Sequence, residues 1–152
     1  MRRHQALYGF IGALLITAGC SSAPMDSSDG AYPPDEPLIN TYWKLVTLDG
    51  APLLPRDHFR EPHLVLHQDA SRLAGATGCN TLMGRYIKEG ERIRFDQVAT
   101  TEMACPAKQM NIEQALLIAL EQATEWHVSG SALELLDGNN EPLANFEAVH
   151  LY

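Results

Sequence analysis

The sequence predicts an α+β fold, a mostly antiparallel β-sheet or open barrel of about seven or eight short strands with one inserted α-helix. Two observations support this fold class. Residues 38–149 contain short segments in which apolar and polar residues alternate, and turn signals rich in Gly, Asn and Asp separate them. Only Lys108–Ala123 has its apolar residues at helical spacing instead.

The first half of the folded region contains strand patterns only. The predicted strands are residues 38–48, 63–67, 71–74, 83–88 and 93–98. Their turn signals are Asp49-Gly50, Gln68-Asp69 and Glu89-Gly90-Glu91. In residues 63–67, Leu64 and Leu66 share one face of the strand and should point into the core.

The second half contains the helix and the remaining strands. One helix face is apolar, formed by Ile112, Ala115, Leu116, Ala119, Leu120 and Ala123. The opposite face carries Gln109, Gln114, Glu121 and Gln122. Strand patterns follow at residues 126–128, 132–136 and 143–149, with turns at Ser129-Gly130 and Asp137-Gly138-Asn139-Asn140.

The N-terminus resembles an export signal that ends in a lipid-attachment cysteine. Arg2 and Arg3 precede an apolar run, residues 6–18, that is too short to span a bilayer, which needs roughly 20 residues. Thr17-Ala18-Gly19-Cys20 resembles the lipobox of bacterial lipoproteins, which implies that Cys20 is acylated, for example with palmitate. The alternative is an ordinary secretory signal, cleaved after the small residues Ser21 and Ala23.

Residues 1–19 are therefore interpreted as a lipoprotein signal peptide, residues 20–37 as a flexible acylated tether and residues 38–152 as the folded domain. The tether has almost no bulky apolar side chain, so it cannot bury enough surface to order itself. Bacterial lipoproteins with Ser after the acylated Cys tend to go to the outer membrane. The resemblance thus implies a protein held by lipid at the periplasmic face of the outer membrane.

The charge balance argues against nucleic acid as a partner. The full chain has a net charge of −8. Residues 1–19 hold two of the eleven basic residues and none of the nineteen acidic ones, so their removal leaves nine basic residues against nineteen acidic and a charge of −10. Phosphate backbones and anionic headgroups repel such a surface, and we expect no Lys or Arg cluster that would bind them locally.

Two cysteines, Cys79 and Cys105, remain once Cys20 is acylated. An exported chain meets an oxidising compartment, where an even pair usually closes, so we expect a disulfide between them. It would close a loop of about 26 residues and stabilise the fold by roughly 3 to 4 kcal/mol in the chain-entropy view. A metal pair or a nucleophile is the alternative, although neither cysteine lies in a Cys-x-x-Cys or Cys/His signature.

Two ordered blocks of residues carry a recognisable motif. The first block is Gly78-Cys79-Asn80, followed by Gly84 and Tyr86, and the second is Thr101-Glu102-Met103-Ala104-Cys105. Together they resemble the META domain family, to which HslJ-like heat-shock lipoproteins belong, and Met110 and Glu113 fall where the family's helix begins. Weaker agreement at Trp43, at Leu133-x-Leu135-x-Asp137 and at Phe146 extends the resemblance over residues 40–148.

The resemblance implies a compact β-rich fold with a helix in an exported or envelope-attached protein, and it implies no known reaction. The motif residues have structural interpretations. Gly75, Gly78 and Gly84 suit positive φ, bulges or close backbone approach. Asn80 can satisfy backbone groups in an irregular turn, and Cys79 and Cys105 would join that turn to the loop before the helix.

Other candidate sites have weaker support. His58, His63 and His67 lie close in sequence, but on a strand His63 and His67 are about 13 Å apart, too far to share one metal ion. Most carboxylates fall in turns or on the polar helix face; Glu102 and Glu113 are the least trivial, and the helix dipole alone would favour an acid near the helix start. We expect no metal, no cofactor and no enzymatic activity.

The expected function is that of a non-enzymatic envelope lipoprotein, active in envelope maintenance or stress tolerance through contacts with an unknown envelope protein. The alternative is a carrier of a lipid or another apolar small ligand in the barrel interior. In a carrier, Trp43, Leu64, Leu66, Leu116 and Leu120 would line a slot; otherwise they fill a core.

Overall fold

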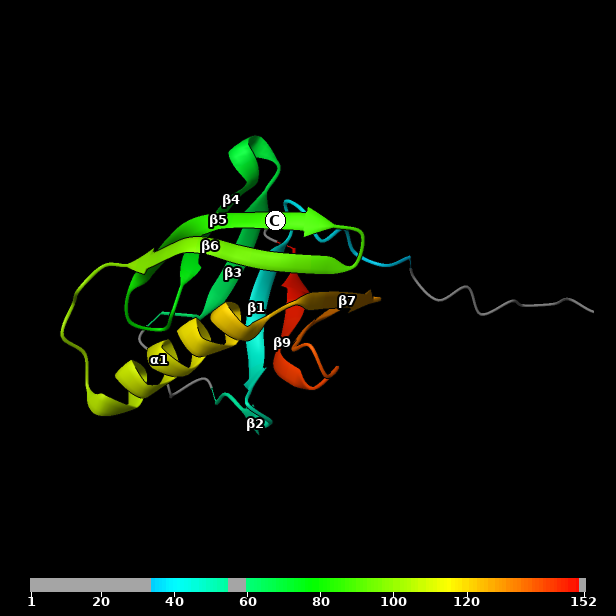
Figure 1. The fold of residues 1–152 in the computed structure, drawn as a ribbon. Coiled ribbons are helices and arrows are strands. Elements are labelled where there is room, and N and C mark those ends of the chain that lie inside the picture. Colours follow the sequence, from blue (N-terminus) through cyan, green and yellow to red (C-terminus); the bar gives the residue numbers. More distant parts are fainter. Residues whose placement is uncertain (1–33, 55–59, 151–152) are drawn as a thin grey trace, which may run out of the picture. The chain divides into compact units, whose positions relative to one another are not determined.

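The computed structural model describes residues 34–54 and 60–150 (Figure 1). The predicted signal peptide, Cys20, nearly all of the predicted tether and His58 lie outside them. The helix is α1 (Ala107–Gln122), and a short 3-10 helix covers Asp69–Ser71. The strands are β1 (Tyr42–Leu48), β2 (Ala51–Pro52), β3 (His63–His67), β4 (Arg72–Ala76), β5 (Thr81–Glu89), β6 (Arg92–Thr100), β7 (Glu125–Ser129), β8 (Ala132–Leu136) and β9 (Pro142–Val149).

The strands of the described region form one antiparallel sheet whose pairings return to the first strand. The order is β2-β1-β3-β4-β5-β6-β7-β8-β9, and β1 also pairs with β9, so all strands except β2 follow one another in a ring. The ring has its shortest pairing between β6 and β7, where only Arg92 and Glu125 are partners. The predicted α+β class with a mostly antiparallel sheet is confirmed.

Several element boundaries differ from those predicted. β1 begins at Tyr42 because the preceding residues make only an isolated parallel bridge, between Ile39 and Leu66. β2 was not predicted, since it is two residues long and contains Pro52, which an edge strand tolerates. β5 and β6 are each longer than predicted, and a bulge opposite Met83 and Arg85 keeps them paired.

The chain contacts the sheet before Leu38. The Gly130 N–H donates to Asp35 Oδ1 at 2.7 Å, and the Glu36 N–H donates to the Gly130 carbonyl at 2.9 Å. Glu36 Oε1 also lies 3.1 Å from His150 Nε2. These contacts fasten residues 35 and 36 to the turn between β7 and β8.

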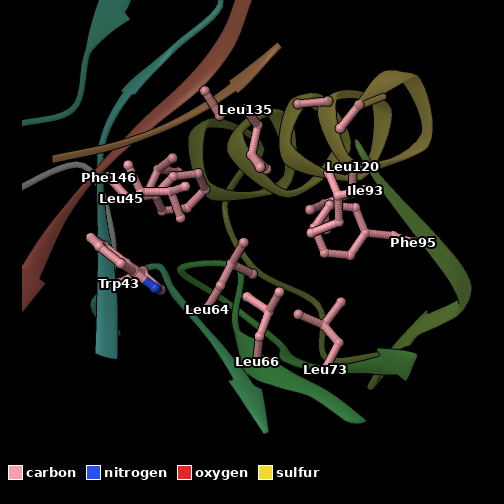
Figure 2. Packing of buried hydrophobic residues seen from close by; sticks show 14 of the residues in the cluster. Trp43, Leu45, Leu64, Leu66, Leu73, Ile93, Phe95, Leu120, Leu135 and Phe146 are labelled. Atoms are coloured by element: carbon pink, nitrogen blue, oxygen red, sulfur yellow. The ribbon is translucent and has the colours of Figure 1, made fainter. Parts of the chain in front are cut away.

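One hydrophobic core lies between the inner face of the sheet and α1 (Figure 2). Trp43 is fully buried, and its indole N–H donates to the Leu38 carbonyl at 3.0 Å, so its one polar atom is satisfied. The five side chains that would line a carrier slot all belong to this core. They are Trp43, Leu64, Leu66, Leu116 and Leu120, each at most 1% exposed.

The buried stripe of α1 is polar at its N-terminal end and apolar at its C-terminal end. Leu116, Ala119 and Leu120 are buried as predicted, but Gln109 and Glu113 are buried as well. The assignment of Gln109 to the solvent face was wrong. Glu113 accepts hydrogen bonds from Thr77 and Asn80 in the β4–β5 turn, and these bonds turn the first half of the helix toward the sheet. Ile112 and Ala115 are consequently only partly buried.

Gly75 marks a close approach between two backbones in the sheet. It pairs with Leu64 across β3 and β4, and a Cβ atom at this position would lie 2.1 Å from the His63 carbonyl oxygen. Real Cβ atoms do not come so near to an oxygen, so any other residue would force the strands apart. Gly75 is therefore explained by packing alone, as the sequence predicted for a glycine of close approach.

We predict that Gly75→Ala lowers the free energy of unfolding by roughly 2 kcal/mol or more, because the added methyl group overpacks a rigid backbone contact. Urea unfolding under oxidising conditions measures it. Gly138→Ala is the matched control, since its Cβ would meet only the Thr124 hydroxyl at 3.9 Å. Equal stability of the two variants would contradict the packing explanation.

A disulfide-linked polar cluster as the candidate functional site

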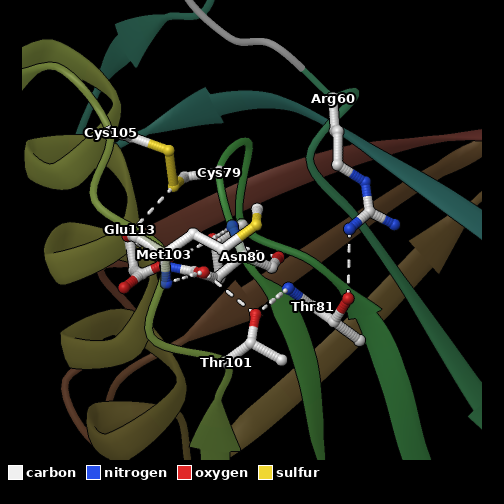
Figure 3. Close-up of a disulfide and its surroundings, with 9 residues drawn as sticks. Arg60, Cys79, Asn80, Thr81, Thr101, Met103, Cys105 and Glu113 are labelled. Atoms are coloured by element: carbon white, nitrogen blue, oxygen red, sulfur yellow. Dashed lines mark hydrogen bonds between the residues drawn. A yellow bond between two sulfur atoms is a disulfide. The ribbon is translucent and has the colours of Figure 1, made fainter.

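A disulfide joins the two motif blocks of the chain. Cys79 lies in the turn between β4 and β5, and Cys105 lies in the loop between β6 and α1; their sulfur atoms are bonded across 26 residues (Figure 3). This confirms the expected pairing and excludes, in this state, a metal pair or a free nucleophile at these positions. The disulfide holds the loop that precedes the helix against the turn that precedes β5.

The Asn80 side chain connects this turn to the loop through its amide group. Its Oδ1 accepts hydrogen bonds from the Met103 backbone N–H at 2.8 Å and from the Thr101 hydroxyl at 2.9 Å. Its Nδ2 donates to Glu113 Oε2 at 2.9 Å and, more weakly, to the Met103 carbonyl at 3.5 Å. With 1% of its surface exposed, Asn80 uses all the hydrogen-bonding capacity of its amide inside the protein.

Glu113 brings the helix into the same cluster. Its Oε2 accepts the Asn80 bond and a second from the Thr77 hydroxyl at 2.6 Å, although Glu113 is only 7% exposed. It is the seventh residue of α1, and the first turn of the helix contains no acidic residue. Proximity to the helix start therefore does not explain Glu113; it is a buried carboxylate held by two donors from the β4–β5 turn.

The backbone of the turn makes this arrangement possible. Gly78 has a φ of +100°, which a side chain would strain, and it places Thr77 and Asn80 on the same side. The Thr77 N–H donates to the Asn80 carbonyl at 2.9 Å, and the Asn80 N–H donates to the Thr77 hydroxyl at 3.0 Å. Arg60 covers the outer side of the turn. Its backbone N–H donates to the Gly78 carbonyl and its guanidinium donates to the Thr81 hydroxyl.

The other motif residues have separate structural tasks. At Gly84 a Cβ would lie 3.1 Å from the Val98 Cα, beside the β5–β6 bulge. The Tyr86 hydroxyl donates to the His67 carbonyl at 3.0 Å, and burial raises the pKa of the phenol. Thr101 and Met103 supply a hydroxyl and backbone groups, whereas the Met103 side chain is 51% exposed.

The remaining sequence candidates do not join the cluster. His63 stacks on Tyr42, with ring centroids 4.2 Å apart, and its Nδ1 lies 2.9 Å from the Glu61 carbonyl oxygen. Burial, followed by the nearby Arg72, lowers the pKa of His67. Glu102 is exposed. Within residues 34–54 and 60–150, no three His, Cys, Asp or Glu side chains are placed to hold a metal ion, and no helix is long and apolar enough to cross a membrane.

Sequence reasoning missed one member of the cluster, Thr77, and one buried polar residue of α1, Gln109. Thr77 was only part of the glycine-rich stretch, and its hydroxyl was assigned no role. Gln109, one helical turn before Glu113, is buried, and its Oε1 has no hydrogen-bond partner among the described residues. A Thr three residues before Asn80 and a Gln four residues before Glu113 were the available signals, but both are ordinary in helices and turns.

The fold and this cluster together define a class of protein: a small α+β domain whose motif residues join a sheet turn, a loop and a helix around one disulfide. The sequence profile of the META domain matches residues 36–150, nearly the whole of the described region. The chain belongs to the META domain family.

Solved structures share this fold. One is an NMR structure of a protein from Burkholderia xenovorans, with 25% sequence identity and a TM-score of 0.62 over 75% of this chain and 85% of that one. A second NMR structure has 14% identity and a TM-score of 0.57, over 71% and 88% of the two chains, and shows likeness of fold alone. No curated protein matches the sequence significantly.

We predict that Asn80→Asp lowers the free energy of unfolding by roughly 3 kcal/mol, because it exchanges the donor that faces Glu113 for a second carboxylate oxygen. Glu113→Gln in the same chain restores a donor and should recover a large part of the loss. A double-mutant cycle from urea unfolding measures the coupling. Additive losses in the double variant would show that the two side chains do not interact as described.

We also predict that Cys79→Ser with Cys105→Ser lowers the free energy of unfolding by roughly 3 kcal/mol, since the unfolded chain regains the entropy of the closed loop. A reductant should destabilise the wild-type chain by a similar amount and leave the double variant unchanged. The variant serves as the control for other effects of the reductant. A wild-type chain insensitive to reductant would contradict a stabilising disulfide.

Proposed function

We propose that this META domain protein is a lipoprotein of the bacterial cell envelope, anchored through Cys20 to the periplasmic face of the outer membrane. The basic N-terminus, the short apolar run and the lipobox-like Thr17-Ala18-Gly19-Cys20 support the anchor. A disulfide between Cys79 and Cys105 is consistent with an oxidising compartment. The polar residues that follow Cys20 would separate the domain from the bilayer.

We further propose that the protein is not an enzyme and acts in envelope maintenance or stress tolerance through contacts with another envelope protein. The observation that carries this proposal is that the polar groups of the two motif residues Asn80 and Glu113 bond within the protein. The donors and acceptors of the Asn80 amide are used within the protein, and Glu113 Oε2 already accepts two hydrogen bonds. A catalytic acid, base or oxyanion site needs such groups directed toward a substrate.

Carriage of an apolar ligand has less support from the same structure. A carrier needs an interior space, and the five side chains that would line it contact one another in the core instead. Two grooves of the described region, about 520 and 550 Å³, open at the surface and are lined in part by charged residues. We therefore put forward the protein-contact function alone.

We predict that the full chain expressed in a Gram-negative host begins at Cys20 and carries acyl chains. Intact-mass analysis before and after reduction and alkylation measures both modifications at once. The expected mass lacks residues 1–19, includes added acyl chains, and gains two alkylated thiols only after reduction. Cys20→Ala is the control. This variant should no longer be found in the membrane fraction, because one lipidated residue supplies the whole anchor. A mass that starts elsewhere, or an unmodified Cys20 in the membrane fraction, would defeat the anchor.

A further inference from the structure

Antiparallel pairing gathers four of the eight arginines of this acidic chain on the outer face of β4, β5 and β6. Arg72 is the direct cross-strand partner of Arg85, and Arg85 is also the partner of Asp96. Arg94 lies two residues before Asp96 and so is the diagonal neighbour of Arg85, at about 7 to 8 Å between backbones. Arg92 follows on the same side of β6. The absence of a Lys or Arg run in the sequence was thus a misleading guide, because the sheet builds the cluster.

This surface, which we call the arginine face, is exposed and lacks ion-pair partners. Arg72, Arg85, Arg92 and Arg94 are all exposed, and no ion pair to any of them occurs among residues 34–54 and 60–150. Glu89, Asp96 and Glu125 are carboxylates on the same side, so the four arginines exceed these three by one positive charge. Outside this face the described residues carry more acidic than basic side chains, and an anionic surface could approach the arginine face.

Large apolar side chains lie between the arginines. Met83 and Ile87 are 49% and 44% exposed, and both point outward from β5 on either side of Arg85, since Leu82 and Tyr86 point into the core. An open groove of about 520 Å³ adjoins the face, with Ile87, Arg92 and Arg94 among its lining residues. Apolar side chains interleaved with cations match the boundary between phospholipid headgroups and acyl chains.

We propose that the arginine face docks the domain on an anionic phospholipid surface. The guanidinium groups would bind lipid phosphates, for which their planar fork is suited, while Met83 and Ile87 would enter the headgroup boundary. The proximity of the face to a bilayer rests on the proposed Cys20 anchor, which would keep the domain beside the membrane. The residues that make up the face do not depend on that anchor. Docking would orient the acidic remainder of the domain away from the membrane.

The test uses the full chain, recovered from the membrane fraction, in vesicles of phosphatidylcholine alone or of equal amounts of phosphatidylcholine and phosphatidylglycerol. Met83→Trp places a fluorescent reporter on the face, and lipids brominated in their acyl chains quench it on contact. Ile118→Trp is the matched reporter, because Ile118 is 45% exposed on α1, away from β5. The signal of the chain without a reporter is subtracted for Trp43 and Trp126.

We expect quenching at position 83 only in the anionic vesicles and none at position 118. Arg85→Gln with Arg94→Gln should weaken docking roughly thirtyfold and remove the quenching, since each basic residue near an anionic surface counts separately. Lys44→Gln with Lys88→Gln removes the same charge from β1 and from the opposite side of β5, and it should preserve the quenching. A salt concentration of 1 M, where the Debye length is about 3 Å, should release the face as well.

Equal quenching of the Met83→Trp reporter in both kinds of vesicle, equal quenching at positions 83 and 118, or equal effects of the two double variants would overturn the proposal. Absence of quenching, together with a response of the Met83→Trp reporter to added polyglutamate, would overturn it in favour of an acidic protein partner. Flotation of the chain with neutral vesicles reports the anchor separately. Failure of the Cys20 anchor would therefore be seen as loss of flotation, and failure of the face as loss of lipid-selective quenching.

Discussion

The fully buried amide of Asn80 is the constraint on which the rest of the structure depends. Its oxygen and nitrogen bond to the loop before α1 and to the helix itself, so one side chain determines how three segments distant in sequence meet. A buried polar group is costly unless satisfied, and here each bond of Asn80 requires another segment to be in place. The disulfide beside it keeps the turn and the loop together, which makes the arrangement a single unit.

This unit also determines how α1 lies on the sheet. Glu113 fixes the rotation of the first half of the helix through Thr77 and Asn80, and the aliphatic residues of the second half then complete the core. The helix is thus held by polar bonds at one end and by hydrophobic burial at the other. Hydrogen bonds have directional requirements that hydrophobic contacts lack. The polar cluster therefore selects one orientation of α1, and the hydrophobic core supplies most of the free energy that drives folding. The motif residues of this chain thus have a structural role, which is to orient the helix on the sheet.

The strands, the helix and the disulfide could be predicted because each rests on a local pattern or on the chemistry of the compartment. Alternation placed Leu64 and Leu66 inside, and the turn at Asp49-Gly50 lies where predicted. The burial of Gln109 and Glu113 could not be predicted, because helical periodicity assigns polar residues to solvent unless a distant partner is known. The role of Thr77 depends on the same long-range information. The pairing of Arg72 with Arg85 could not be predicted either, because it depends on the strand register.

The pairing of Arg72 with Arg85 is informative because it does not stabilise the fold. Like charges directly opposite each other across two strands are destabilising, and a solvent-exposed position there accepts many polar residues. Arg85 gains some relief from Asp96 on its other side, but Arg72 and Arg94 have no such partner in the register. Nor does solubility require them, because an acidic chain is kept soluble by its carboxylates and each arginine reduces its net charge. The sheet is stabilised from its inner side, by Leu73, Leu82 and Tyr86, so its outer side is free to carry an arrangement that costs stability. An unfavourable charge pattern on a surface that folding leaves unconstrained is best explained by something outside the chain that it binds.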